Sequence, residues 1–273
     1  MPAQAATTSA NETVLLREQL GSIAVLTLNR PQARNSLSES LLEALAGELA
    51  AVAADNSIRA VVIAASGNVF CAGHDLKELT ARRSDADKGR AYFTQLMDQC
   101  SGVMQAIVRL PQPVVAAVQG VATAAGCQLV ASCDLAIASD KAGFCTPGVD
   151  IGLFCSTPMV ALSRNVSNKH AMEMLLTGDI ISAEHAQRIG LVNRVVADDD
   201  LDAFVDGWAR RLAAGPPIAL AQTKRMLDNA MHVTLEQALD DEGAAQTVNF
   251  GTADTAEAMA AFIGKREPKF EGR

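Results

Sequence analysis

Short aliphatic runs alternate with longer runs of helical apolar spacing along the first two thirds of the chain. Runs typical of strands, bounded by glycine, proline or polar residues, occur at 13–17, 23–28, 60–65, 113–118 and 135–138. Runs typical of helices occur at 37–54, 89–110 and 124–132. Strands that alternate with helices in this way indicate an α/β fold in which most strands pair in parallel.

The pattern changes near residue 198, after which no strand-like run follows. Helices are predicted at 198–214, 218–231, 235–248 and 252–263, with a break at the glycine and two prolines of 215–217. We therefore expect a disordered tail at 1–11, a core at 12–198 and a helical region at 199–273. Because the helical region is small, we expect it to pack on the core or on another subunit.

Composition narrows the classes of function. The 273 residues are 49% hydrophobic and carry a formal net charge of −8, so most of the chain is expected to be folded and a nucleic-acid partner is not expected. No apolar run reaches the length of about 18 residues that a membrane span needs. The N-terminus lacks the features of a leader peptide, which favours a cytoplasmic location. Six cysteines without metal-binding spacing predict buried free thiols and no metal site.

Two glycine-containing loops each follow a predicted strand. The first, at 70–79, holds Gly73, His74 and Lys77, and the second, at 119–129, enters a helix of small residues. Ligands of α/β sheets bind outside the strand ends, so both loops are expected at one edge of the sheet. Two backbone N–H groups that converge there can polarise a carbonyl oxygen. Taken alone, the first loop is better explained by an ordinary turn at Gly73 than by an oxyanion site. For the second loop, tight packing of a buried helix is an alternative that spacing does not exclude.

At these loops the chain resembles the enoyl-CoA hydratase/isomerase (crotonase) superfamily. The resemblance runs from about residue 12 to 270, and a shorter likeness at 122–134 and 152–158 points to the subgroup called enoyl-CoA hydratase domain-containing protein 3. It implies a crotonase-like spiral of ββα units followed by a C-terminal helical trimerisation region, in a homotrimer or a hexamer of two trimers. The motifs that carry it, in family order, lie at 28–31, 70–77, 113–120, 126–129, 132–138, 174–178, 190–192 and 261–266.

The resemblance also implies a ligand and the residues that bind it. The ligand is an acyl-CoA thioester, with coenzyme A as part of the substrate and no separate cofactor. The oxyanion-binding N–H groups are expected on His74 and Ala125. Contacts to the coenzyme A part are expected from Arg34, Ser36, Ala72, His74 and Lys77, and from Phe262, Lys265 and Lys269 at the C-terminus, where a neighbouring subunit supplies the lysines.

The chain departs from the family pattern at the acidic positions. The two glutamates that hydratases use fall on Gln128, whose amide takes no proton, and on Gly148, which leaves room for a bound water or a small anion. A third acidic position, used by some isomerases, falls on Ser156. Asp150 and His74, which is expected to titrate near neutrality, are the replacement candidates. General acid–base groups contribute about 10²–10⁴ each, so hydration is expected to be slow.

Three functions remain open at this point. The chain is an acyl-CoA lyase or isomerase with unusual acid–base groups, an acyl-CoA-binding regulatory trimer with little turnover, or an enzyme of another thioester reaction such as hydrolysis or decarboxylation. Asp134 matches a family position that we take as structural. His170, His185 and His232 lie in polar helical contexts, and we expect no catalytic role for them.

Overall fold

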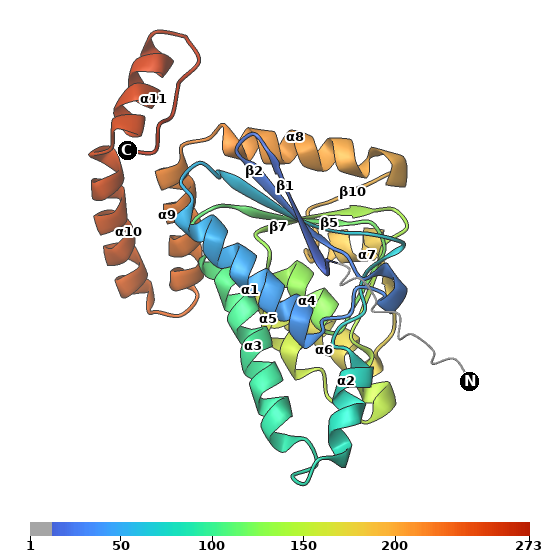
Figure 1. Cartoon of the computed structure of the whole chain (residues 1–273). Coiled ribbons are helices and arrows are strands. Elements are labelled where there is room, and N and C mark those ends of the chain that lie inside the picture. The colour runs from blue at the N-terminus through green and yellow to red at the C-terminus, as the bar shows by residue number, and fades with distance from the viewer. Residues whose placement is uncertain (1–12) are drawn as a thin grey trace.

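The computed structural model describes residues 13–273 and contains two β-sheets surrounded by helices (Figure 1). The tail expected at 1–11 lies outside the described residues. The larger sheet has the strand order β1-β2-β3-β5-β7-β10, in which only the β1–β2 pair is antiparallel. Its strands are β1 (Leu15–Leu20), β2 (Ile23–Leu28), β3 (Ala60–Ala65), β5 (Val114–Val118), β7 (Leu135–Ser139) and β10 (Arg194–Val196).

A smaller sheet has the order β4-β6-β8-β9, with the first three strands parallel. Its strands are β4 (Val69–Cys71), β6 (Val121–Thr123), β8 (Gly143–Cys145) and β9 (Ile181–Ser182). The chain places β3, β5 and β7 in the larger sheet and the strand that follows each of them in the smaller one. A helix comes after each such pair, which confirms the expected spiral of ββα units.

Helices cover both faces of the larger sheet (Figure 1). The main apolar core lies between the sheet and the helices α1, α3 and α4. The helix α1 begins two residues later than predicted. The hydroxyl of Ser38 accepts a hydrogen bond from the amide of Leu41, so Ser38 caps the helix at its N-terminus. These helices and the shorter ones around them are α1 (Glu39–Ala54), α2 (Leu76–Ala81), α3 (Arg90–Arg109), α4 (Ala125–Ser132), α5 (Ser156–Asn165), α6 (Asn168–Thr177) and α7 (Ala183–Arg188).

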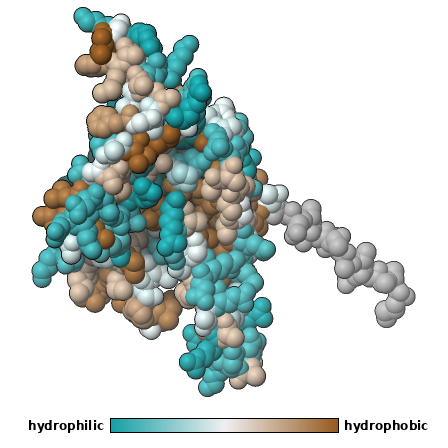
Figure 2. Space-filling view, turned by 90° about the vertical axis from the view of Figure 1, so that its left-hand side faces the viewer, coloured by the Kyte–Doolittle hydropathy of each residue, from teal (hydrophilic) through white to brown (hydrophobic). Residues whose placement is uncertain are grey.

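The boundary expected at residue 198 falls just before α8 (Leu201–Ala213), which packs on the opposite face of the larger sheet through Leu201, Val205 and Ala209. The helix α9 (Pro217–Ala230) follows it and lies against the body, and α10 (Leu235–Phe250) and α11 (Ala253–Ile263) stand out from the body (Figure 1). Figure 2 shows apolar patches among polar residues on the face that these helices form. The exposed apolar side chains there include Leu227, Leu235, Leu239, Val248, Phe250, Met259, Phe262 and Ile263.

One lysine of α9 anchors these helices to the core. The Nζ atom of Lys224 donates to the carbonyl oxygen of Ile107 at 2.8 Å and to Oδ2 of Asp134 at 2.7 Å. The same Oδ2 also accepts the amide of Val114, at 2.7 Å. Asp134 therefore joins the start of β5 to the C-terminal region. Among the described helices, none is both long and apolar enough to cross a membrane.

Candidate active site

The two predicted loops meet at one edge of the smaller sheet. The strands β4 and β6 pair in parallel, so their carboxyl ends lie side by side. Gly73 follows β4 with a φ of +80°, and a methyl group on it would lie 2.9 Å from Cβ of Ala124 and 3.3 Å from the amide nitrogen of Ala125. Both the left-handed backbone and this close approach require glycine at position 73.

Backbone N–H groups at this junction lack protein partners among the described residues. Among residues 13–273, neither the amide of His74 nor that of Ala125 donates a hydrogen bond to a protein acceptor. Ala125 is the first residue of α4, where backbone N–H groups lack an intrahelical acceptor. The preceding residue, Ala124, has a φ of 52° and donates its amide to the carbonyl of Cys145 at 2.9 Å. Ala124 therefore adopts a backbone conformation that residues other than glycine rarely take, at the point where α4 begins.

An ion pair holds the loop that carries His74. Asp75 accepts a hydrogen bond from Arg30 at 3.0 Å and one from the hydroxyl of Ser36 at 3.2 Å. Its other oxygen accepts the amide of Lys77 and caps α2. Burial acts to raise the pKa of Asp75, but the hydrogen bonds from Arg30 and Lys77 outweigh it and hold the pKa below its usual value. The sequence prediction missed this network, although an aspartate before a helix signals a cap.

The side chain of His74 is neutral at pH 7. Burial lowers its pKa from the ordinary value of 6.5 to about 4. The expectation that His74 titrates near neutrality is therefore wrong, because the ring is largely removed from water and has no charged partner that would favour the protonated form.

The two positions of the hydratase glutamates have different surroundings. Gln128 is buried on α4, one turn after Ala125, and its Oε1 atom accepts a weak hydrogen bond from the thiol of Cys100 at 3.9 Å. Gly148 is buried in a turn, and a methyl group on it would lie only 2.7 Å from Sγ of Cys155. Its amide donates to this sulfur at 3.1 Å. The room for water or an anion expected at Gly148 is thus absent, because the Cys155 thiol fills it.

The other acid–base candidates lie on neighbouring elements. The Asp150 side chain is exposed, and its Oδ2 atom lies 3.3 Å from the position that a methyl group on Gly178 would take, at the end of α6. Ser156 is the first residue of α5, and its amide donates to the carbonyl of Phe154 at 2.8 Å. The helix α5, which begins at Ser156, packs against α4, the helix that carries Gln128.

Comparison with known proteins now decides the family. The profile of the enoyl-CoA hydratase/isomerase family matches residues 18–273. The chain belongs to this family. It is 43% identical to the mitochondrial enoyl-CoA hydratase domain-containing protein 3 of Rattus norvegicus over 92% of this chain and 82% of the relative. It is also 35% identical to the 2,3-dehydroadipyl-CoA hydratase of Escherichia coli, over 96% of this chain and all of that enzyme.

Solved structures of the family have the same fold. The crystal structure of human enoyl-CoA hydratase domain-containing protein 3 matches with a TM-score of 0.90 at 41% identity, covering 94% of this chain and 100% of that chain. An enoyl-CoA hydratase from Mycobacterium smegmatis also matches with a TM-score of 0.90, at 47% identity over 95% of this chain and 99% of that chain. The expected crotonase fold and the likeness to the domain-containing protein 3 subgroup are thereby confirmed.

The residues that the family resemblance assigns to coenzyme A fall into two groups. Arg34 and Lys77 are exposed. Ala72 lies between them and donates its amide to the carbonyl of Arg34 at 3.0 Å. Phe262 and Lys265 lie at the end of α11, on the opposite side of the molecule from α2 (Figure 1). One subunit therefore does not bring the two groups together.

The cysteines are free and buried, as expected. Burial raises the pKa of Cys71 to about 12 and that of Cys100 to about 11. Burial also raises the pKa of Cys155, although the Gly148 amide favours its thiolate. Since the thiolate is the nucleophile, these groups are unreactive at neutral pH. Burial raises the pKa of the remaining thiols as well, those of Cys127, Cys133 and Cys145.

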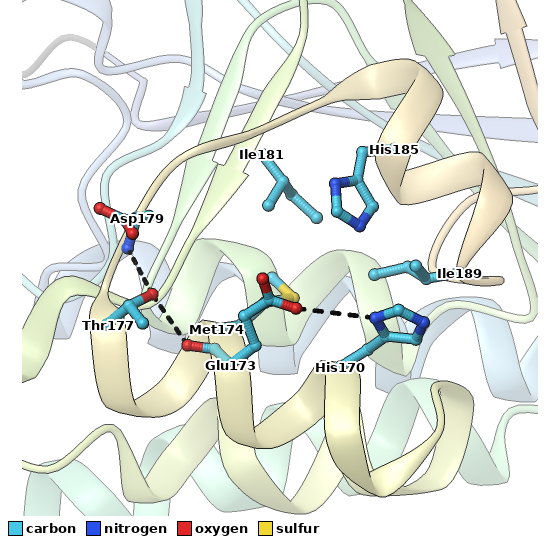
Figure 3. Close-up of a pocket in the computed structure, with 8 residues that line it drawn as sticks. All are labelled: His170, Glu173, Met174, Thr177, Asp179, Ile181, His185 and Ile189. Atoms are coloured by element: carbon cyan, nitrogen blue, oxygen red, sulfur yellow. Dashed lines mark hydrogen bonds and ion pairs between the residues drawn. The ribbon is translucent and has the colours of Figure 1, made fainter.

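A separate cavity of about 40 Å³ lies between α6, β9 and α7 (Figure 3). Two histidines line it, with the ring of His170 edge-on to that of His185 at a centroid distance of 6.0 Å. Nδ1 of His170 lies 3.8 Å from Oε2 of Glu173. No group of three or more histidine, cysteine or acidic residues in the described part of the chain is placed to hold a metal ion. None of the lining residues comes from the two loops.

Proposed function

We propose that this protein binds an acyl-CoA thioester and stabilises its enolate through the amides of His74 and Ala125. The observation that carries the proposal is that these two N–H groups are unpartnered on adjacent loops. A thioester oxygen gains charge when an enolate forms, and preorganised donors stabilise it. Loss of one such donor typically costs about 10²–10³ in rate.

Hydration of a double bond needs more than these amides. It needs groups that deliver a proton to one carbon and activate water at the other. Gln128 cannot exchange a proton at neutral pH, and the thiol of Cys155 occupies the space beside Gly148. We therefore propose that enolate stabilisation is retained while hydration is slow. Asp150 and Ser156 remain tentative acid–base candidates of this proposal.

Two alternatives use the same loops. In the first, the chain is a regulatory protein that binds acyl-CoA with little turnover, which the substituted acid positions favour. In the second, it catalyses another thioester reaction, a hydrolysis or a decarboxylation, which also passes through a stabilised oxyanion or enolate. The unpartnered amides favour a protein that still catalyses a thioester reaction over one that only binds acyl-CoA.

The proposal includes an oligomer. The exposed apolar side chains of α9 to α11 need a covering surface, because patches of this kind mark interaction sites. We propose a homotrimer, or a hexamer of two trimers, in which Phe262 and Lys265 of one subunit reach the coenzyme A bound near Arg34 and Lys77 of the next. The cytoplasmic location stays a prediction, and the rat relative is a mitochondrial protein by name.

Two measurements test the proposed function. Acetoacetyl-CoA forms an enolate with its own ultraviolet absorbance, and we expect the protein to shift this ligand toward the enolate on binding. Crotonyl-CoA hydration should be far below the typical enzyme turnover of about 10 s⁻¹. If no CoA ester binds, the proposal fails; hydration at ordinary rates would instead refute the inference from Gln128 and Gly148.

A variant separates enolate stabilisation by the amides from hydration, which needs an acid. Gln128→Glu restores one acid at the family position without adding volume, and we expect a partial gain in hydration of crotonyl-CoA. Gln95→Glu makes the same chemical change at an exposed position of α3 and should have no effect. Gly148→Glu is unsuitable alone, because its Cβ would collide with Sγ of Cys155.

A further inference from the structure

Hydrogen bonds of the backbone around His74 fix the direction in which its N–H group points. Leu37 donates its amide to the carbonyl of Gly73 at 2.7 Å, and Asp75 donates its amide to the carbonyl of Leu37 at 3.2 Å. These contacts make Leu37 and His74 a parallel bridge pair. In such a pair, the residues before and after the bridged one bond to the neighbouring segment, so the N–H group of the bridged residue points the other way. The amide of His74 therefore points away from Leu37.

One guanidinium group holds both sides of this bridge. Arg30 donates from Nη1 to the carbonyl oxygen of Ser36 at 2.6 Å and from Nη2 to Oδ2 of Asp75 at 3.0 Å. Each of these two partners is the direct neighbour of a bridged residue. The nitrogens of a guanidinium lie in one rigid plane, so Arg30 sets the separation of the two segments that the bridge joins.

The contacts around this guanidinium form a closed ring. The hydroxyl of Ser36 donates to Oδ2 of Asp75 and accepts from Nη1 of Arg30, both at 3.2 Å. The side chains of Arg30 and Asp75 are only 18% and 11% exposed. Water therefore competes little for these groups, and each contact limits the movement of the other two.

The backbone of Arg30 is itself tied to the connection between the two sheets. The buried side chain of Asn35 accepts the amide of Arg30 through Oδ1 at 2.8 Å. Its Nδ2 atom donates to the carbonyl oxygens of Ser66 and Val69, both at 2.8 Å. Ser66 directly follows β3 and Val69 begins β4. The guanidinium is thus held by the framework of the fold, and through it the loop of His74 is held as well.

We propose that Arg30 is a positioning residue that, through Ser36 and Asp75, aims the N–H group of His74 at the thioester oxygen. The proposal rests on the proposed acyl-CoA function and adds a residue that acts without touching the ligand. A misplacement of about 1 Å in a site can cost about 10²-fold in rate. Loss of the guanidinium should therefore weaken enolate stabilisation although the amides of His74 and Ala125 both remain.

The enolate of acetoacetyl-CoA tests the proposal. We expect Arg30→Met, which keeps much of the apolar stem, to lower the ratio of enolate to keto form of the bound ligand. The ratio should fall at least about ten-fold, the effect of weakening one hydrogen bond to a charged group. Ultraviolet absorbance at saturating protein measures this ratio. A merely structural role would reduce the amount of folded protein and leave the ratio within the bound ligand unchanged.

A pair of matched ligands gives a second measurement. S-butyl-CoA is the thioether that corresponds to butyryl-CoA, and it lacks the carbonyl oxygen that the amides would bind. Calorimetric titration should show that Arg30→Met weakens binding of the thioester and leaves binding of the thioether unchanged. Equal weakening of both ligands would place the effect on the shared coenzyme A part and overturn the proposal.

Further variants locate the contact and serve if Arg30→Met fails to fold. Arg30→Lys keeps a positive charge without the planar fork, and it should retain part of the enolate ratio. Asp75→Asn removes the opposite charge and should lower the ratio as Arg30→Met does. The double variant should be no worse than the more affected single one, because both changes break one contact. Arg17→Met is the matched control: its 2.8 Å pair with Glu48 joins β1 to α1, and the ratio should stay unchanged.

The remaining outcomes are also decisive. An unchanged enolate ratio in folded Arg30→Met would overturn the proposal, and so would fully additive losses in the double variant with Asp75→Asn. If the wild type itself binds no CoA ester or forms no enolate, the proposed function fails and the role of Arg30 falls with it. That result is distinct from a wild type and an Arg30→Met variant that form the enolate equally well.

Discussion

Lys224→Met tests whether one buried ion pair holds the C-terminal helices on the core. Methionine keeps most of the apolar stem of lysine and removes only the Nζ atom and its charge. The variant loses the 2.8 Å hydrogen bond to Ile107 and the 2.7 Å ion pair with Asp134. The carboxylate of Asp134 then retains the amide of Val114 as a partner, without a positive charge beside it.

The structure sets the magnitude of the expected loss. Breaking a fully buried ion pair by removing one partner costs about 3–5 kcal/mol. The side chains of Lys224 and Asp134 are 11% and 24% exposed, so water reaches the carboxylate in part. We expect a loss of about 2–4 kcal/mol in the free energy of unfolding. Lys141→Met is the matched control, because its pair with Asp198 has the same length of 2.7 Å but exposures of 69% and 33%, and it should cost far less than Lys224→Met.

Urea denaturation at one fixed protein concentration measures both losses, because the stability of an oligomer depends on the protomer concentration. Amide hydrogen exchange along α9 should accelerate in Lys224→Met and not in Lys141→Met. The double variant Lys224→Met with Asp134→Asn should cost less than the sum of the two single changes, because no uncompensated charge is left. Equal losses for the two lysine variants would show that burial does not set the strength of this contact.

Three further predictions follow from the site. Gly148→Ala should lower the free energy of unfolding by about 1–3 kcal/mol, since its Cβ would lie 2.7 Å from Sγ of Cys155. Adding Cys155→Ala should recover much of this loss in urea titrations. A purely additive loss in the double variant would contradict the steric explanation. Because His74 has a folded-state pKa of about 4 against 6.5, the unfolded chain binds more protons between these pH values, so stability should rise with pH across this window by at most about 3 kcal/mol. His74→Phe should flatten that dependence, and an unchanged slope would assign it to other groups. Ser36→Ala should change the Kd of a CoA ester less than about two-fold, because the hydroxyl is used by Asp75 within the protein; a ten-fold loss would show that it contacts the ligand.

Local pattern was enough to predict the main strands and helices. The strands 23–28 and 60–65 have the predicted ends, because a run of buried aliphatic residues between polar or glycine boundaries is a local feature. The strands of the smaller sheet could not be predicted from local pattern. They are two or three residues long, too short for a periodic pattern, and they exist because distant segments such as 69–71 and 121–123 pair with each other.

The site was predictable in part for the same reason. The loops of Gly73 and Ala125 follow predicted strands, and the parallel pairing of those strands' neighbours brings the loops together. The surroundings of Gly148 were predicted wrongly, because the thiol that fills them comes from a residue seven positions later that folds back. The pKa of His74 was also predicted wrongly, because burial depends on the packing around the ring and not on its neighbours in the chain.

The sequence by itself determined the α/β class, the order of the main elements and the lack of an acid at positions 128, 148 and 156, since these depend only on residue identity and local spacing. The tertiary structure alone decided that the amides of His74 and Ala125 lack a protein partner among the described residues, where the thiol of Cys155 lies and how Lys224 anchors α9. Each of these depends on contacts between residues that are separated along the chain. Hydrogen-bond satisfaction and burial are properties of such contacts, so they appear only once the chain has folded.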